Sequence, residues 1–375
     1  MLPDDLLAVV YGMVASPRDR ARFAAVCRCW RTGARTAPPV PVLPWLLLSK
    51  YDGNMTKSAY CPEDGTVVSV PCKPVMSWVI GGHDGGWLVS SILACIRIVN
   101  IFSGVEVPLA ERQRQVVGAS HVHLLKIVFS QAPTSGDCVL AANTLNCGVA
   151  LCRLGCPEGG WTIQGSPSEN YADITFCNGD LYALVKFETG MSKKGAPMIT
   201  AARRLAVNHP RPAVSNYHIF DLHGKIALAF KTIWSVSLEP FFKVFQLVDI
   251  HADGSQAHYK HKWLEVTCLN DYALFLGKTF SKVVHMPANT NTRGDIQRNR
   301  IYYTRDYSFD KFSVLPRSAV FLTTWNDSDH QIYYKEDAKI KDMAGDDVKR
   351  IRSIEYLTKC NTSTYGGMWI LPPVI

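Results

Sequence analysis

Turn dipeptides between alternating apolar runs recur along most of this chain, and they constrain its fold more than any other feature. Asn178-Gly179, His223-Gly224 and Asp253-Gly254 each separate two runs that are rich in β-branched and aromatic residues. A tight hairpin turn needs positive φ, which glycine and asparagine tolerate, so this pattern is the strongest short-range hairpin signal. We therefore expect antiparallel hairpins at these three positions in a chain that is mainly β.

The hairpin signals repeat with a period. Asn178 and His223 lie 45 residues apart, and upstream runs such as DGGWLVSS and IRIVNIFSGVEVPL contain further strand-like segments. A period of about 40–50 residues with several strands in each unit is typical of propeller blades. We expect blades at roughly 72–112, 120–165, 170–213, 215–267 and 270–306, followed by a less regular region.

Two further features bear on this β-domain. The segment 183–214 resembles an insertion, and the terminal run MWILPP can close a ring by pairing with an N-terminal strand, which removes exposed sheet edges. Four tryptophans are expected in the blade core, namely Trp87, Trp161, Trp263 and Trp369. A β-sandwich, or two stacked β-domains, is the alternative architecture.

Helical signals concentrate in the first 36 residues. Asp4 or Asp5 can cap a first helix, whose apolar residues recur at helical spacing from Leu6 to Val14. Ser16 and Pro17 fit the N-cap and first position of a second helix, and Gly33 is expected to end the helical region.

A proline-rich segment separates these helices from the β-region. TAPPVPVLP contains four prolines, which cannot continue a helix. We expect a small helical domain at 1–36, a proline-rich linker at 37–44 and a β-propeller-like domain at 45–375.

Composition limits the partners and the compartment. Hydrophobic residues make up 47% of the 375 residues and charged residues 19%, which is typical of a folded globular protein. The net charge of +8 comes without a dense basic stripe, so we expect no nucleic-acid partner. The twelve cysteines show no disulfide framework, and acidic residues stand where a signal peptide has basic ones. Free thiols in the cytoplasm or nucleus are the simpler interpretation.

The stretch 79–102 is long and apolar enough to be tested as a membrane span. His83, Asp84 and Arg97 interrupt it, and its glycine-rich GGHDGG would break a helix in a bilayer. Two buried strands that flank a turn are the better interpretation, so no membrane contact is expected.

No constellation of residues indicates catalysis, a cofactor or a metal. The group Cys147, Cys152 and Cys156, with His121 and His123 upstream, lacks zinc-ligand spacing and is better interpreted as small residues buried in strands. GGHDGG lacks the Lys-Ser/Thr pair of a phosphate-binding loop, and a Gly-x-Ser-x-Gly elbow is absent. Asp253, His258 and His261 have no obvious nucleophile beside them.

The N-terminal segment resembles the F-box motif. The match consists of Leu2-Pro3-Asp4-Asp5-Leu6-Leu7, then Ser16-Pro17-Arg18-Asp19-Arg20, then Val26-Cys27-Arg28-Cys29-Trp30-Arg31, within residues 2–36. More weakly, PVLPWLLLS, GGWLV, IYY at 301–303 and MWILPP are similar to plant F-box proteins whose remaining chain is a kelch-like β-propeller domain of unknown function.

This resemblance implies a role without chemistry of its own. F-box proteins bind a Skp-type adaptor and so join a cullin–RING ubiquitin ligase, while their second domain holds the protein substrate. The chain would then be a non-catalytic substrate receptor of an SCF-type ligase. A propeller hydrolase with its active site in the central channel, or an F-box scaffold outside any ligase, are the alternatives.

The F-box resemblance also indicates which residues meet the adaptor. A three-helix unit of about 35 residues is too small to bury its own apolar side chains well. We expect adaptor contacts from Leu2, Pro3, Leu6, Leu7, Pro17, Val26, Cys27 and Trp30, rimmed by the arginines at 18, 20, 22, 28 and 31. For Leu7, Val10 and Phe23, a place in the helical core is favoured over the interface.

Overall fold

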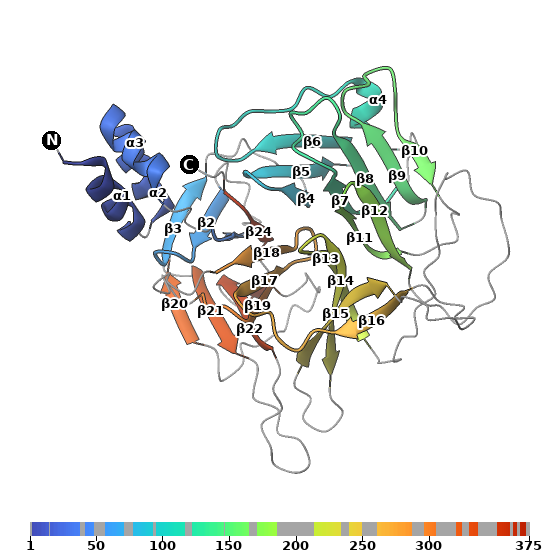
Figure 1. Cartoon of the computed structure of the whole chain (residues 1–375). Coiled ribbons are helices and arrows are strands. Elements are labelled where there is room, and N and C mark those ends of the chain that lie inside the picture. The colour runs from blue at the N-terminus through green and yellow to red at the C-terminus, as the bar shows by residue number, and fades with distance from the viewer. Residues whose placement is uncertain are drawn as a thin grey trace, which may run out of the picture.

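Three helices occupy the N-terminal segment of the computed structural model, and the other regular elements that it describes are strands, apart from one short helix (Figure 1). The structure describes residues 2–14, 16–37, 42–48, 57–70, 78–92, 95–116, 122–145, 147–164, 171–185, 214–233, 240–249, 261–286, 296–304, 320–324, 330–336, 351–360, 363–365 and 368–372. The chain is thus mainly β, a propeller preceded by three helices, as its sequence pattern predicts. Half of the expected linker and most of the expected insertion lie outside the described residues.

The N-terminal helices form a small unit with its own core. They are α1 (Asp4–Met13), α2 (Pro17–Ala25) and α3 (Arg28–Thr36), and we call them the helical unit. Leu7, Tyr11 and Phe23 are buried at its centre, and the Phe23 ring lies 4.3 Å from that of Trp30, centroid to centroid. Leu7, Tyr11 and Phe23 make up the buried part of this cluster, which is small for three helices.

Gly33 does not end α3, contrary to the expectation from sequence. It lies inside the helix and is buried, and a Cβ placed there would come within 2.5 Å of the Leu7 Cβ. The glycine is therefore required by the close approach of α3 to α1, and a helical interior position carries it despite its low helix propensity.

The helix starts also differ from the expected caps. Pro3 stands at the N-cap of α1, and Asp4 and Asp5 fall in its first turn, where negative charge is favourable. Ser16 does stand at the N-cap of α2 with Pro17 behind it, but its side chain makes no capping hydrogen bond. The Ser16 hydroxyl bonds instead to Asp64, on the first sheet of the propeller.

Among the described residues the strands form six sheets. In the first, the strand order is β24 (Met368–Ile370), β1 (Trp45–Leu48), β2 (Lys57–Cys61) and β3 (Thr66–Val70). The second contains β4 (Trp78–His83), β5 (Trp87–Ile92) and β6 (Cys95–Asn100), followed in sequence by the short helix α4 (Glu111–Arg114). The third contains β7 (Leu124–Phe129), β8 (Val139–Thr144), β9 (Gly148–Arg153) and β10 (Thr162–Gln164).

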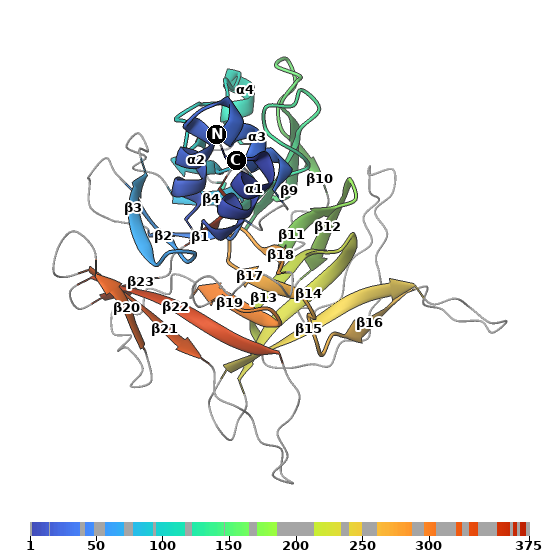
Figure 2. The same cartoon turned by 60° about the vertical axis from the view of Figure 1, so that its left-hand side comes forward.

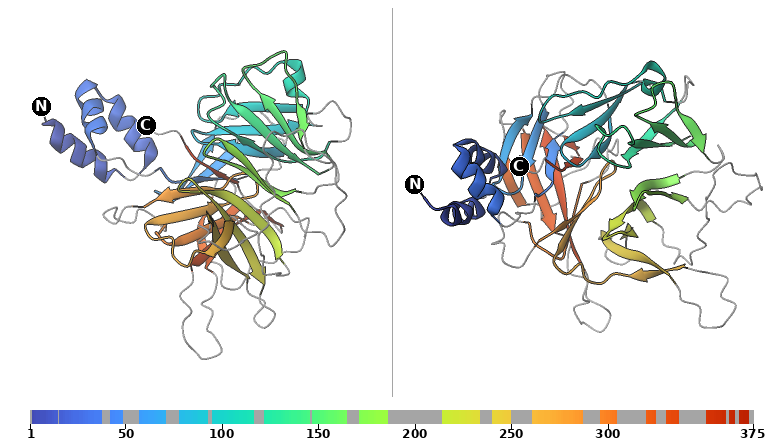
Figure 3. Two further views of the ribbon diagram at one scale, coloured as in Figure 1. Left: turned by 45° about the vertical axis from the view of Figure 1, so that its right-hand side comes forward. Right: turned by 45° about the horizontal axis from the view of Figure 1, so that its top comes forward.

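The remaining sheets complete the ring. The fourth pairs β11 (Tyr171–Cys177) with β12 (Asp180–Val185), and the fifth runs β13 (Val214–Leu222), β14 (Lys225–Ile233), β15 (Pro240–Asp249) and β16 (His261–Glu265). The sixth contains β17 (Tyr272–Leu276), β18 (Lys282–His285), β19 (Arg300–Thr304), β20 (Val320–Thr324), β21 (His330–Glu336), β22 (Arg352–Cys360) and β23 (Ser363–Tyr365). The turned view in Figure 3 shows these sheets around a common centre, with the helical unit outside the ring.

Two of the three predicted hairpins are confirmed. Asn178-Gly179 joins β11 to β12 and His223-Gly224 joins β13 to β14, with φ between 51° and 84° at all four residues. The Asn178 side chain also donates a 2.7 Å hydrogen bond to the Gly224 carbonyl, so the two turns support each other. The turn expected at Asp253-Gly254 lies outside the described residues.

The expected blades match the sheets unevenly. The ranges 72–112, 120–165 and 215–267 contain the second, third and fifth sheets. The range 270–306 is wrong as a unit, because β19 pairs in parallel with both β17 and β22 and so joins the C-terminal strands to the same sheet. Such parallel pairing links segments far apart in sequence, which a local period does not reveal.

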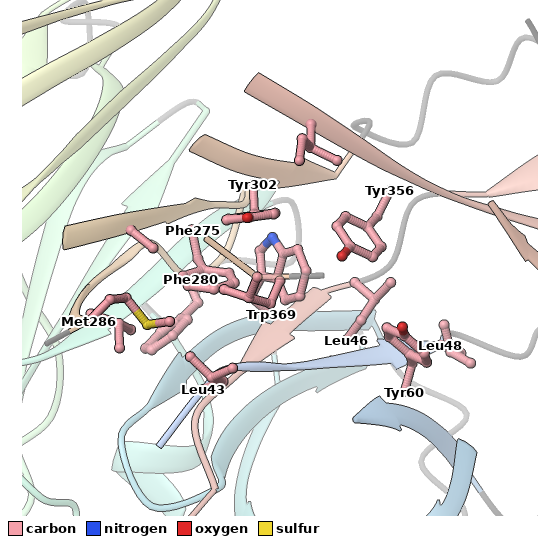
Figure 4. Packing of buried hydrophobic residues seen from close by; sticks show 14 residues of the cluster. Leu43, Leu46, Leu48, Tyr60, Phe275, Phe280, Met286, Tyr302, Tyr356 and Trp369 are labelled. Atoms are coloured by element: carbon pink, nitrogen blue, oxygen red, sulfur yellow. The ribbon is translucent and has the colours of Figure 1, made fainter. Parts of the chain in front are cut away.

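The predicted closure of the ring is confirmed. β24 pairs antiparallel with β1, with Trp369 opposite Leu46. Figure 4 shows the Trp369 indole among Phe275, Tyr302 and Tyr356 of the sixth sheet, and its ring lies edge-on to Phe275 and Tyr356 at 5.0 and 5.3 Å. Trp369 is fully buried, so the C-terminal strand contributes to the largest aromatic cluster of the core. Trp87, Trp161 and Trp263 pack at the edges of other core clusters, as expected.

One buried carboxylate ties three sheets together. Asp173 on β11 accepts a 2.7 Å bond from Lys126 Nζ of β7 and a 2.9 Å bond from the Ile219 amide of β13. Both members of the ion pair have only 6% of their side-chain surface exposed. Burying two charges is costly unless they are paired and hydrogen-bonded, and here both conditions are met.

The apolar stretch 79–102 contains β4, β5 and β6, where two strands were expected. In the part of the chain that the structure describes, no helix is long and apolar enough to span a membrane. Of the three clustered cysteines, only Cys152 is buried in a strand, where burial raises the pKa of its thiol to about 11. Cys156 is exposed, which corrects the expectation that it is buried in a strand.

Candidate protein-docking surface

An apolar stripe runs along the outer face of α1. Leu6, Val9, Val10 and Met13 are spaced three or four residues apart, which places them on one side of the helix. Each has between 43% and 73% of its surface exposed. We call these four residues the α1 stripe. Leu2, one turn ahead of Leu6, is 54% exposed and extends it.

The opposite side of α1 faces the helical core. Leu7 is only 1% exposed and Tyr11 is 7% exposed, so they hold α1 against α2 and α3. This burial corrects the inclusion of Leu7 among the adaptor contacts and favours its alternative place in the core, together with Phe23. Val10 was expected in the helical core, but it is exposed.

The other residues expected at the interface have mixed positions. Pro3, Val26 and Cys27 are exposed, with Val26 and Cys27 at the break between α2 and α3. Trp30 is half-buried because its ring packs on Phe23. The side chain of Pro17 lies outside what the structure describes.

Val9 and Met13 belong to the α1 stripe but were not among the predicted contacts. A signal for them was present, because they lie three and seven residues after Leu6 and so share its side of the helix. The helical phase relative to the core residues Leu7 and Tyr11 decides which apolar side chains of α1 stay outside.

The exposed charged side chains of the helical unit are mostly basic. Exposed arginines on α2 and α3 outnumber the exposed acidic residues of the helical unit, and they are Arg18, Arg22, Arg28, Arg31 and Arg35. The acidic ones are Asp4, Asp5 and Asp19, the last of which pairs with Arg22 at 2.9 Å. Arg20 is the exception among the expected rim arginines, because it is buried.

The described residues of the propeller present no comparable chemical site. No group of three or more His, Cys, Asp or Glu side chains in this part of the chain is placed to hold a metal ion. Of the described carboxyl groups, the one with a raised pKa belongs to Glu63, in the turn between β2 and β3. His261 pairs with Asp249 at 2.6 Å, while Asp253 and His258 lie outside the described residues.

Of the comparisons with known proteins, the match to a family model agrees with the fold. The family model described as the KIB1-4 beta-propeller matches residues 60–334, most of the chain. No curated protein matches it. Of the solved structures, one titled "Crystal structure of the eukaryotic initiation factor" is 10% identical, covers 88% of this chain and 74% of its own, and has a TM-score of 0.25, which supports no argument. The match to the family model is sufficient on its own, and this chain belongs to the KIB1-4 β-propeller family.

Proposed function

We propose that this chain is the substrate receptor of an SCF-type cullin–RING ubiquitin ligase. The helical unit binds a Skp-type adaptor, and the propeller binds the protein to be modified. The chain itself performs no catalysis, since ubiquitin is transferred by other subunits. The observation that supports this proposal most is the α1 stripe, a row of large apolar side chains left in water by a folded unit.

The stripe matches what a protein partner needs. Burying an exposed Leu, Val or Met side chain is worth about 1.5–3 kcal/mol, so several such residues supply substantial binding free energy. Large apolar side chains that gather on one exposed face indicate an interaction site more than single exposed ones do. The exposed arginines of the helical unit favour a partner with an acidic surface.

The family membership supports the second half of the proposal. A propeller presents loops on its faces, and such loops commonly bind proteins. The chain belongs to a propeller family, and its order of a helical unit followed by a propeller fits a receptor with one end for the adaptor and one for the target.

Binding of the full-length chain to a purified Skp-type adaptor tests the proposal. The double variant Leu6→Asp/Met13→Asp puts two charges into the stripe and should weaken binding about 30-fold or more, as for the loss of a central apolar anchor. Leu264→Asp is the matched control, since Leu264 on β16 is 54% exposed, close to the 51% of Leu6. The assignment fails if the wild-type chain does not bind, or if the double variant binds equally well while its circular dichroism is unchanged.

A reconstituted reaction separates a ligase subunit from a scaffold. Receptors held in such a complex are expected to acquire ubiquitin themselves when adaptor, cullin, RING protein and conjugating enzyme are supplied. Wild-type chain should be modified, the stripe variant should not, and Leu264→Asp should behave as wild type. Adaptor binding without modification would favour a scaffold that acts outside a ligase.

A further inference from the structure

The helical unit contacts the propeller through a buried polar junction. Glu63, in the turn between β2 and β3, is 5% exposed, and its carboxylate accepts hydrogen bonds from the Leu43 amide at 3.1 Å and the Cys61 thiol at 3.0 Å. These three residues all belong to the first sheet or the segment that leads into it. Figure 2 shows the helices next to this part of the ring.

The other side of the junction is one face of α2. Ser16, Arg20 and Phe23 are spaced four and three residues apart, so they point to the same side of the helix. Phe23 faces the helical core, and Arg20 is buried to 5% exposure beside it. The charge of Arg20 favours the ionised form of Glu63, and the Ser16 hydroxyl bonds to Asp64 in the same turn.

The burial of Arg20 indicates that the helical unit packs against the propeller and is not joined to it by the connecting chain alone. Arg18 and Arg22, two residues away on either side, are exposed, as arginines on a small surface helix normally are. An arginine loses its hydration when it is buried, and it tolerates this only opposite a carboxylate or other acceptor. A helical unit that merely hung from the propeller would leave Arg20 in water.

The junction adds little to the free energy of folding, but it favours one arrangement of the helical unit on the propeller. Burial raises the pKa of the Glu63 carboxyl above its usual value, and the Cys61 thiol, the Leu43 amide and Arg20 only partly offset this rise. Desolvation therefore outweighs the attraction between the charges. Buried ion pairs of this kind are best attested where they select one arrangement over others.

We propose that Arg20, Ser16, Glu63 and Asp64 lock the helical unit onto the first sheet, so that the two parts of the chain move as one body. The α1 stripe is then held at a fixed distance and orientation from the propeller faces. This inference goes beyond the proposed function and holds for any partner of the stripe.

Hydrogen exchange of the full-length chain tests the lock from across the junction. Arg20→Glu places a third negative charge against Glu63 and Asp64 and should accelerate exchange of amides in β2 and β3 (residues 57–70) at least about tenfold. Arg18→Glu makes the same charge reversal on an exposed neighbour and should leave these amides unchanged. Protection of α1 and α3 reports separately whether the helical unit stays folded.

Ser16→Ala is the second variant and removes one hydroxyl without adding charge. It should accelerate exchange in the same sheet segment to a smaller extent, with α1 and α3 still protected. The proposal is overturned if residues 57–70 keep wild-type exchange in both variants. None of these readouts involves the adaptor, so failure here and failure of adaptor binding are independent results.

Discussion

The helical unit leaves many of its large apolar side chains exposed, whereas the propeller buries most of its own. Of the large hydrophobic side chains that the described part of the structure leaves exposed, six fall within residues 2–26 and five are scattered over the rest. The propeller buries its apolar residues in several clusters between sheets, while the helical unit buries essentially Leu7, Tyr11 and Phe23. A unit of three short helices has too little interior to bury all of its apolar side chains, so the surplus stays exposed.

The largest expected loss of stability that affects the propeller but not the helices comes from removing the Trp369 side chain of the closing strand β24. Trp369→Ala should lower the free energy of unfolding by about 3–5 kcal/mol, because the indole is fully buried among Phe275, Tyr302 and Tyr356. Chemical denaturation followed by near-ultraviolet circular dichroism measures this loss.

Trp369→Phe is the informative companion variant. The indole N–H of Trp369 has no hydrogen-bond partner among the described residues, so phenylalanine loses packing but no bond. Its cost should be well below that of alanine. Equal costs for both variants would contradict the view that packing between the first and sixth sheets is what Trp369 contributes.

The buried ion pair between Lys126 and Asp173 gives the next largest effect. Lys126→Met leaves the Asp173 carboxylate buried without its cation and should cost about 3 kcal/mol of unfolding free energy. Lys282→Met breaks the partly exposed pair with Asp84 and should cost less than about 1 kcal/mol. Urea titrations of both variants measure the contrast, and similar losses would show that Asp173 is better solvated than its burial indicates.

The helical unit can be broken while the propeller stays intact. Gly33→Val forces a side chain against Leu7 and should destabilise the helical unit by about 1–3 kcal/mol. Gly12→Ala is the matched control, because nothing lies within 4 Å of a Cβ there and alanine is the better helix former.

Far-ultraviolet circular dichroism and adaptor binding should both fall in Gly33→Val and be kept in Gly12→Ala. The propeller transition should be unchanged in both variants. A Gly33→Val chain with wild-type helical signal would show that α1 and α3 can separate without loss of structure.

The smallest expected effect is a pH dependence at the boundary between the two regions. Because burial raises the folded-state pKa of Glu63 above 4.5, its contribution to stability is fully present below pH 4.5 and is lost as pH rises through the raised value. Glu63→Gln lacks this dependence and should gain stability relative to wild type as pH increases from about 4.5 to 7.

The groups that face Glu63 affect this result in known directions. Burial raises the pKa of the Cys61 thiol, which therefore stays protonated, and the charge of Arg20 acts to lower the pKa of Glu63. Burial alone would raise the pKa of Asp64, but hydrogen bonds from Thr66 and Ser16 lower it, so its contribution is lost only in stronger acid. Glu158→Gln, at an exposed position, controls for the substitution itself. If Glu63→Gln loses stability relative to wild type as pH rises, the assignment is contradicted.

Local chemistry allowed two of the hairpins to be predicted from the sequence, whereas the closing strand was expected from the ring architecture, because closure removes exposed sheet edges. A positive φ at Asn178-Gly179 and His223-Gly224 is a property of those residues and their neighbours, and so it can be read without tertiary information. The parallel alignment of β17, β19 and β22 could not be predicted, because pairing between distant strands depends on loops and packing that no short window contains.

The candidate docking surface was predictable in kind but only partly by residue. The excess of apolar side chains on the first helix is visible in the sequence, and helical phase could have separated Leu7 from Val9 and Met13. The burial of Arg20 was not visible, because Arg18, Arg20 and Arg22 look equivalent until the turn that carries Glu63 is placed opposite α2. The role of Gly33 was misjudged for the same reason, since only the position of α1 explains it.

The pairing of β24 with β1 has a consequence for how the protein is made. While the ribosome is still producing the later strands, β1 has already emerged with the apolar run Trp45–Leu48 and one free edge. A free apolar edge of this kind readily pairs with other chains. Nascent molecules should therefore depend on chaperones until the final strand arrives, and synthesis that stalls in the last blade should yield aggregates.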